Sequence, residues 1–184
     1  MLQINTVLLL LILFVGVKLS SPGPAIYVHK RVGKNGSLLK CLKFRSMYKD
    51  ADKQLVRILA ENPEMRKQWE KERKIQNDPR VTPFGKFLRK TSLDELPQLL
   101  NVLRGNMSLI GPRPVTESEL EYYGEYADYV FSVKPGLSGM WQVSGRSDTS
   151  YEERITFDTY YIQNWSIWLD IWILIKTVWV VLNG

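Results

Sequence analysis

The sequence predicts a mainly helical α+β fold with a small β-hairpin or sheet, amphipathic interfacial helices and a partial re-entrant membrane helix. Three observations support this prediction: an apolar run at residues 7–17, two strand-like stretches around an Asn-Gly pair, and a tryptophan-rich segment at 165–182. The 184 residues suffice for one domain with a hydrophobic core. We therefore expect a membrane-inserting segment at 1–19, a main domain at 20–164, and an interfacial helix at 165–184 that belongs to the same domain.

The apolar run at 7–17 is followed directly by Lys18. It does not resemble a signal peptide, because no basic residue precedes it and no small-residue cleavage site follows it. A helix needs about 20 apolar residues to cross a bilayer, and this run with its flanks is shorter. We expect it to enter a membrane without crossing it. A buried core helix is the alternative.

The next segments predict a hairpin. The cluster Ser20-Ser21-Pro22-Gly23-Pro24 ends any preceding helix. Residues 25–32 and 37–44 then flank a four-residue turn with Asn-Gly in it, which is typical of two antiparallel strands.

Helices account for most of the remaining chain. Residues 48–76 are highly charged and favour a solvated helix that is broken near Pro63. A short basic helix is expected at 82–91 and another helix at 96–104. An acidic, tyrosine-rich helix is expected at 116–130, a glycine-rich loop at 132–148 and a further helix at 150–163.

The segment at 165–182 is apolar almost all round when it is drawn as a helix. At 100° per residue, its four tryptophans fall within about 60° of one another. A thin polar stripe of Ser166, Asp170 and Thr177 lies on the far side. This pattern favours a helix at a membrane interface, where Lys176 would extend to the lipid headgroups. The alternative is a tryptophan row that packs into the core.

The composition limits the kinds of partner. A net charge of +6 favours an anionic partner: nucleic acid, anionic lipid or nucleotide. Nucleic acid is disfavoured because the cations are interleaved with acids and form no stripe with aromatic residues. A single histidine, His29, excludes a multi-histidine metal site, so any metal should be a hard ion on carboxylate oxygens.

The acidic pair Asp94-Glu95 lies at a predicted helix start, shortly after Arg89. The segment from Ser92 to Glu95 also fits a Ser-x-x-Glu capping box, which is a purely structural alternative. Pro97 weighs against a cap at Ser92, because it would clash with a carbonyl one turn back. A later start puts Pro97 in the first turn and Asp94 near the helix N-terminus, which stabilises an ionised carboxylate. Such a carboxylate can attack phosphorus, so the pair indicates phosphoryl transfer.

Several cations are candidate ligands for phosphate or nucleotide. Each alone is typical of a surface cation. Arg113 lies between two prolines and Arg146 ends the glycine-rich loop, so backbone there allows a substrate to come close. The full set of candidates is Lys43, Arg45, Arg89, Arg113 and Arg146.

Several long stretches resemble one known family in the same order along the chain. They are SSPGPAIYVHKRVGKNG (20–36), KFRSM (43–47), NDPRVTPFGKFLRKTSLDELPQL (77–99), MSLIGPRP (107–114), VKPGLSGMWQVSGRS (133–147) and the tryptophan-rich tail. The family is that of the bacterial sugar transferases, the monotopic phosphoglycosyl transferases. The WEKE insert at 69–72 and the stretch at 144–170 most resemble the branch that transfers galactose or glucose phosphate.

The resemblance implies an enzyme that transfers a hexose 1-phosphate from a UDP-sugar to undecaprenyl phosphate, releases UMP and initiates surface glycan synthesis. It implies that residues 20–164 are the catalytic domain, seated with membrane lipid on the cytoplasmic face of a bacterial inner membrane. A homodimer is left open, and no nucleic-acid partner is expected. Two alternatives remain: a non-catalytic membrane-surface module that binds anionic lipid or nucleotide, and an inactive, N-terminally truncated transferase.

The resemblance also implies roles for individual residues. Asp94 would be the nucleophile that forms a covalent phosphosugar intermediate, and Asp94 and Glu95 would hold Mg²⁺. Arg89, Arg113 and Arg146 would contact nucleotide or phosphate, while Gly136 and Gly139 would shape the nucleotide loop. Asp158 and Asp170 match acidic positions that organise the metal or active site, although each also fits an ordinary salt bridge.

The N-terminus departs from the family pattern. Family members usually begin with a basic Phe-Asp segment and an apolar helix broken by Ser-Pro, so that the chain dips into one leaflet and returns. This sequence has neither feature, and Val7 and Leu8 lie near the place of the break. We expect that it holds only the returning half, with weaker anchoring than in a complete member.

Overall fold

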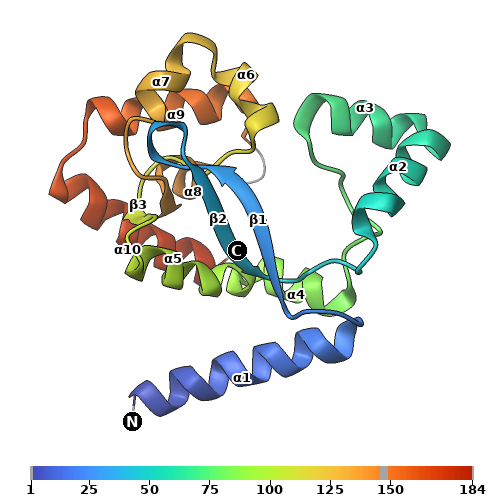
Figure 1. Cartoon of the computed structure of the whole chain (residues 1–184). Coiled ribbons are helices and arrows are strands. Elements are labelled where there is room, and N and C mark those ends of the chain that lie inside the picture. Colours follow the sequence, from blue (N-terminus) through green and yellow to red (C-terminus); the bar gives the residue numbers. More distant parts are fainter. Residues whose placement is uncertain (1, 146–148, 184) are drawn as a thin grey trace. The chain divides into compact units, whose positions relative to one another are not determined.

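The computed structural model describes residues 2–145 and 149–183. The chain forms two compact units, Met1–Tyr27 with Phe44–Asp94, and Val28–Lys43 with Glu95–Gly184. Helices predominate in both units, and the strands within the described residues form two small two-stranded sheets. The predicted mainly helical α+β class is therefore confirmed. The predicted membrane-inserting segment lies in the first unit, and the predicted interfacial helix lies in the second (Figure 1).

The first unit contains α1 (Leu2–Ser20), α2 (Ala51–Glu61), α3 (Pro63–Glu72) and α4 (Pro83–Lys90). The break that Pro63 predicts is confirmed, because Pro63 starts α3 and the Asn62 side chain caps it. Thr82 caps α4 by accepting a hydrogen bond from the Gly85 amide at 2.9 Å. Such a cap, followed by proline at the first helical position, is a strong start signal.

One face of α1 packs on α4. Leu13 and Val17 are buried, and Gly16 lies so close to the Phe84 ring that an added Cβ would meet it at 2.4 Å. The other apolar side chains that the structure describes on α1 are mostly exposed, among them Val7, Leu8, Leu11, Ile12 and Phe14. Only one stripe of α1 is therefore a core surface. No helix within residues 2–145 and 149–183 has both the length and the apolarity needed to cross a bilayer.

The predicted hairpin is confirmed. Strands β1 (Ile26–Val32) and β2 (Leu38–Phe44) are joined by the 3₁₀ turn η1 (Lys34–Gly36). Asn35 has a φ of 55°, a left-handed conformation that asparagine tolerates better than most residues. The residues of this short turn were thus enough to predict where both strands lie.

The glycine-rich stretch differs from its prediction as a loop. It contains β4 (Gly136–Ser138) and α8 (Met140–Ser144), and β4 pairs in parallel with β3 (Ser108–Ile110). The partners are Ser108 with Gly136 and Ile110 with Ser138. Three-residue strands are too short to show an alternating pattern, so the sequence did not reveal this pair.

The predicted helix at 116–130 is also wrong as a single element. The chain forms η3 (Glu117–Glu119), α6 (Leu120–Tyr123), η4 (Gly124–Tyr126) and α7 (Ala127–Val130). The interruption lies at Gly124, whose φ of 48° is left-handed and ends α6. Tyr123, Val130 and Phe131 nevertheless form one buried cluster, against which Ile155 packs.

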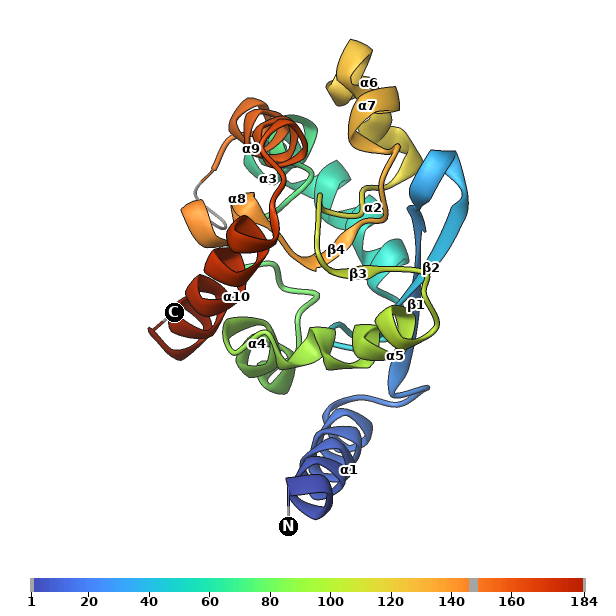
Figure 2. The same cartoon turned by 90° about the vertical axis from the view of Figure 1, so that its left-hand side faces the viewer.

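The last two helices complete the second unit. Helix α9 (Tyr151–Gln163) begins with a capping box between Ser150 and Glu153, and α10 (Ile167–Asn183) packs along α8, β3 and β4 (Figure 2). Ile173 of α10 is fully buried beside Ile110 and Tyr161. The core side of α10 is thus a narrow stripe.

The tryptophan row of α10 faces away from this core. The exposed fractions are 75% for Trp168, 42% for Trp172 and 64% for Trp179, and 61% for Trp165, which directly precedes the helix. The thin polar stripe instead faces the protein: Asp170 accepts a hydrogen bond from Tyr161 at 2.8 Å, and Thr177 bonds Ser138 at 2.6 Å. The core-packing alternative for the tryptophans is therefore wrong.

Candidate functional site

The acidic pair lies on the short 3₁₀ turn η2 (Leu93–Gln98), just before α5 (Leu99–Leu103). Ser92 has a left-handed φ of 56°, which is not the extended backbone of a usual N-cap. The turn begins at Leu93 and contains Pro97, as the later start required. The regular helix expected from 96 is shorter and begins only at Leu99. Asp94, 8% exposed, ends the first unit, and Glu95 begins the second.

Arg89 is the predicted cation whose charge interacts with that of Asp94. It comes from the last turn of α4, and its Nε donates to Ser46 Oγ at 2.9 Å. Burial lowers the pKa of Arg89, while the negative charges of Asp94 and Asp78 oppose that shift. Arg80 holds Asp78 in a nearly buried ion pair at 2.6 Å. In the first unit, Asp94 and Arg89 thus stabilise each other's charged forms.

Glu95 has its own cation. Lys43 Nζ lies 2.6 Å from Glu95 Oε1, so β2 and η2 are joined by an ion pair. Burial raises the pKa of Glu95, but Lys43, Arg113 and Arg31 together lower it below its ordinary value. Glu95 is therefore ionised at neutral pH.

Arg113 is the centre of the charged cluster in the second unit. It lies in the Gly-Pro-Arg-Pro loop after β3, and its Cζ is 4.9 Å from the centroid of the Trp141 ring. Nearby, Arg31 of β1 and Glu119 form an ion pair at 2.7 Å with about a tenth of each side chain exposed. Burial raises the pKa of Glu119, yet Arg31 and the Thr116 hydrogen bonds lower it to about 2. This cluster is anchored by permanently charged groups.

Gly136 and Gly139 let two backbone segments approach closely. A Cβ on Gly136 would lie 2.2 Å from the Gly111 amide nitrogen, and one on Gly139 would lie 2.2 Å from the Gly111 carbonyl oxygen. Gly111 and Gly136 also donate hydrogen bonds across the β3–β4 pair, to Ser138 and Pro112. These glycines therefore support the loop that carries Arg113. Their predicted contact with nucleotide stays a prediction.

Arg45 lies elsewhere in the first unit. It is buried, and its Nη2 donates to the Ser21 carbonyl at 2.5 Å and the Val17 carbonyl at 3.5 Å. A cation at these carbonyls satisfies the C-terminal end of α1. Arg146, the last of the predicted cations, lies outside the described residues.

The two remaining acids have different surroundings. Asp158 of α9 is fully buried and accepts a hydrogen bond from Tyr123 at 3.0 Å. Burial raises its pKa to about 7, despite the nearby Arg113 and Arg154. Asp170 instead bonds Tyr161 and, at 3.3 Å, the Trp165 indole nitrogen. The charge of Asp158 interacts with those of Arg113 and Arg154.

Comparison with known proteins identifies the family of this chain. The family model for bacterial sugar transferases matches residues 1–184. The chain is 55% identical over 161 residues to an undecaprenyl-phosphate galactose phosphotransferase from Salmonella typhimurium, which covers 88% of this chain and 34% of that protein. It is 45% identical over 170 residues to the Escherichia coli UDP-glucose:undecaprenyl-phosphate glucose-1-phosphate transferase, covering 88% and 33%.

The chain belongs to the bacterial sugar transferase family. It spans about a third of the length of the two curated relatives above. A shorter relative, the exopolysaccharide production protein ExoY of Sinorhizobium fredii, is 52% identical over 162 residues, which is 88% of this chain and 72% of that protein. The similarity thus falls on the units that hold Asp94, Glu95 and Arg113.

The acid pair Asp94 and Glu95 fits the way in which proteins usually bind Mg²⁺. Within the described residues, no three acidic, histidine or cysteine side chains are grouped to hold a metal ion. Mg²⁺ usually keeps several waters and binds one or two carboxylates together with substrate phosphates. Consecutive carboxylates, of which Glu95 is held ionised, fit that mode. Mg²⁺ binding by Asp94 and Glu95 stays a prediction.

Sequence reasoning missed three members of the charged cluster. Arg31 and Glu119 are 88 residues apart, and Arg154 of α9 lies with its Cζ 5.0 Å from the Trp141 ring centroid. Arg31 and Arg154 lie within the stretches at 20–36 and 144–170 that resemble the family, and Glu119 forms a capping box with Thr116. None of these signals indicates that the three residues meet.

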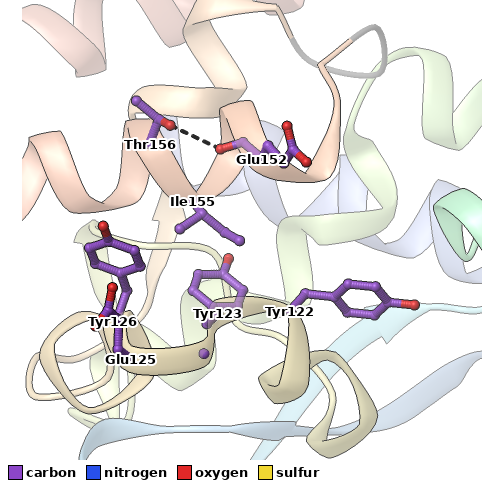
Figure 3. A pocket seen from close by; sticks show the side chains of 8 residues that line it. Tyr122, Tyr123, Glu125, Tyr126, Glu152, Ile155 and Thr156 are labelled. Carbon is purple, nitrogen blue, oxygen red and sulfur yellow. Dashed lines mark hydrogen bonds between the residues drawn. The ribbon is translucent and has the colours of Figure 1, made fainter.

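An open cavity of about 550 Å³ lies between α6–η4 and α9 (Figure 3). Tyr122, Tyr123 and Tyr126 line it together with Glu152 and Ile155. Thr156 donates to the Glu152 carbonyl along its helical wall. The acid pair does not line this cavity.

Proposed function

We propose that this sugar transferase moves a hexose 1-phosphate from a UDP-sugar to undecaprenyl phosphate, releases UMP, and so initiates surface glycan synthesis. One observation carries the proposal: Asp94 and Glu95 are consecutive, and each has a cation that stabilises its ionised form, Arg89 for Asp94 and Lys43 for Glu95. The names of the relatives support undecaprenyl phosphate as acceptor and a galactose or glucose phosphate as cargo.

The first half-reaction makes Asp94 a covalent carrier. A carboxylate oxygen of Asp94 attacks the phosphorus that bears the sugar. As the new oxygen–phosphorus bond forms, the bond from that phosphorus to the bridging oxygen breaks, and UMP leaves with the bridging oxygen and its electron pair. An ionised carboxylate is the required nucleophile, and Arg89 favours that form.

The second half-reaction restores the enzyme. A phosphate oxygen of undecaprenyl phosphate attacks the same phosphorus, the bond to Asp94 breaks, and the carboxylate is regenerated. Arg113, rigidly held between Pro112 and Pro114, would stabilise phosphate charge in both steps. Mg²⁺, when bound by Asp94, Glu95 and substrate oxygens, would neutralise the diphosphate.

We further propose a seat at the cytoplasmic face of the bacterial inner membrane. Two exposed apolar surfaces support it: the outer face of α1 and the tryptophan row of α10. Aromatic rings with a polar edge are stabilised at the membrane–water boundary. Such a seat gives a soluble donor and a lipid acceptor access to one carrier in turn.

Asp94→Asn tests the covalent step. Asparagine has nearly the volume of aspartate but is not a nucleophile, so turnover should be lost while the protein remains folded. Wild type incubated with UDP-sugar labelled in the sugar phosphate, without lipid, should retain label on the protein. The variant should retain none.

Asp128→Asn, at an exposed position of α7, is the matched control and should behave as wild type. Full UMP release by Asp94→Asn would contradict the mechanism. Wild type that binds lipid vesicles but releases no UMP from any UDP-hexose would instead indicate a non-catalytic membrane module.

A further inference from the structure

Two guanidinium groups from distant parts of the second unit lie over one aromatic ring. Arg113 Cζ is 4.9 Å and Arg154 Cζ is 5.0 Å from the centroid of Trp141. Trp141 is 8% exposed, so the ring is a fixed surface of the core rather than a mobile side chain. A cation over an indole face is favourable, but two cations over one indole also repel each other.

Within residues 2–145 and 149–183, no ion pair joins either guanidinium to a carboxylate. Among the described residues, the acids of this cluster pair with other cations, Glu119 with Arg31 and Glu95 with Lys43. Arg154 Nη2 donates to the Thr149 carbonyl at 3.3 Å, while its buried Nε has no hydrogen-bond partner in the described part of the chain. Burial and the charge of Arg113 both lower the pKa of Arg154. Its position therefore costs free energy while no anion is bound.

The cluster has an excess of positive charge. Among the described residues its four cations are Arg31, Lys43, Arg113 and Arg154, and two acids, Glu95 and Glu119, are ionised at neutral pH, so two positive charges are in excess. His29 adds none at neutral pH, because burial and Arg31 lower its pKa to about 4. Ionisation of the buried Asp158 would reduce the excess to one. A phosphate group matches an excess of one to two charges.

We propose that Arg154 is a phosphate-binding residue of this enzyme, the second guanidinium of a site in which Arg113 is the first and Trp141 supports both. The ligand is a phosphate group of an organic phosphate. Guanidinium presents paired N–H donors that suit phosphate oxygens, and a phosphate between the two groups turns their repulsion into two attractions.

Rigidity on both sides supports this assignment. Arg113 is held by the Gly-Pro-Arg-Pro loop, whose Pro112 is fully buried, and Arg154 by a helix that the Ser150–Glu153 capping box starts. Preorganised donors lose little conformational entropy on binding. The inference rests on the proposed function for its substrates: the phosphate is supplied either by the nucleotide donor or by the lipid acceptor.

Direct binding measurements test the site separately from catalysis. Titration calorimetry with UDP and with inorganic phosphate should show weaker binding to Arg154→Gln, by roughly tenfold or more for one lost charged contact. Arg154→Lys keeps the charge but not the paired donors, and should be intermediate. Arg104→Gln removes one exposed cation from the end of α5 and should bind as wild type. All variants should unfold at the temperature of wild type.

The steady-state constants then distinguish the two sources. A higher KM for UDP-sugar in Arg154→Gln, with the KM for undecaprenyl phosphate unchanged, assigns the site to the donor, and the reverse assigns it to the lipid phosphate. Unchanged UDP and phosphate binding together with unchanged KM values would overturn the proposal. Wild type that binds UDP through Arg154 but forms no labelled Asp94 would support the site and contradict the proposed function.

Discussion

At the scale of single residues, Asp158 shows how burial changes an acid. Its folded-state pKa of about 7 lies above the ordinary value of 3.8, because the carboxyl group is fully removed from water. The folded protein therefore holds this proton more tightly than the unfolded chain between about pH 4 and pH 7. The free energy of unfolding should fall as pH rises through that window.

Asp158→Asn should remove this pH dependence. The amide is neutral at every pH and can still accept the Tyr123 hydrogen bond. Between pH 5 and pH 8 the variant should gain about 2–3 kcal/mol in unfolding free energy relative to wild type. Urea denaturation in detergent at both pH values measures the difference. The same pH dependence in variant and wild type would show that Asp158 is ionised in the folded state throughout.

At the scale of elements, α10 has one side that packs on the protein and another that is exposed. The polarity of its side chains alone does not show which side is which. The stripe that faces the protein contains the buried Ile173 together with the half-buried Asp170 and Thr177, whose polar groups bond Tyr161 and Ser138. The exposed stripe contains the tryptophans. A helix that turns its polar side chains towards the protein and its aromatic rings outward is suited to lipid rather than to water.

Replacing Trp168 and Trp172 together with Ser should therefore release the protein from membranes or weaken its lipid-dependent step. The folded core should be unaffected, because both rings are exposed. Flotation with anionic lipid vesicles measures the bound fraction. Replacing Val56 and Leu103, exposed apolar residues on other helices, with Ser is the matched control. An unchanged bound fraction for the tryptophan variant would contradict the interfacial role.

At the scale of the whole molecule, the chain passes between its two units at the acid pair, after Asp94. The two proposed membrane elements belong to different units, α1 to the first and α10 to the second. We expect residues 4–17 to dip into the cytoplasmic leaflet without crossing, and we expect four cations to lie on the cytoplasmic side: Lys18, Lys30, Arg31 and Lys34.

Single cysteines at Asn5 and Asn35 test this topology with a membrane-impermeant thiol reagent on intact cells. Neither Asn5→Cys nor Asn35→Cys should be labelled from outside, and both should react after the cells are opened and the membranes dissolved. The native Cys41 is buried, so it should contribute little background. Labelling of Asn5→Cys from outside would show a full crossing and refute the re-entrant path.

Local chemistry made some features predictable. The hairpin turn at Asn35, the break at Pro63 and the late start at Leu93 each depend on a few neighbouring residues, and the structure confirms all three. The single helix at 116–130 failed for a related reason: a glycine is compatible with a helix, and only the conformation that Gly124 adopts shows the interruption.

The sequence by itself determined the fold class, the family and the candidate acid pair, because hydrophobic patterns, turn residues and long motifs can each be recognised from residues that are close together in the sequence. Only the tertiary structure decided which charges meet. Arg31 with Glu119, Lys43 with Glu95, and Arg113 with Arg154 over Trp141 are partners tens of residues apart. Glycines at 136 and 139 were visible as turn residues, yet their close approach to Gly111 depends on a parallel pairing of three-residue strands. No local pattern encodes such contacts, because they form only when packing of the core brings the segments together.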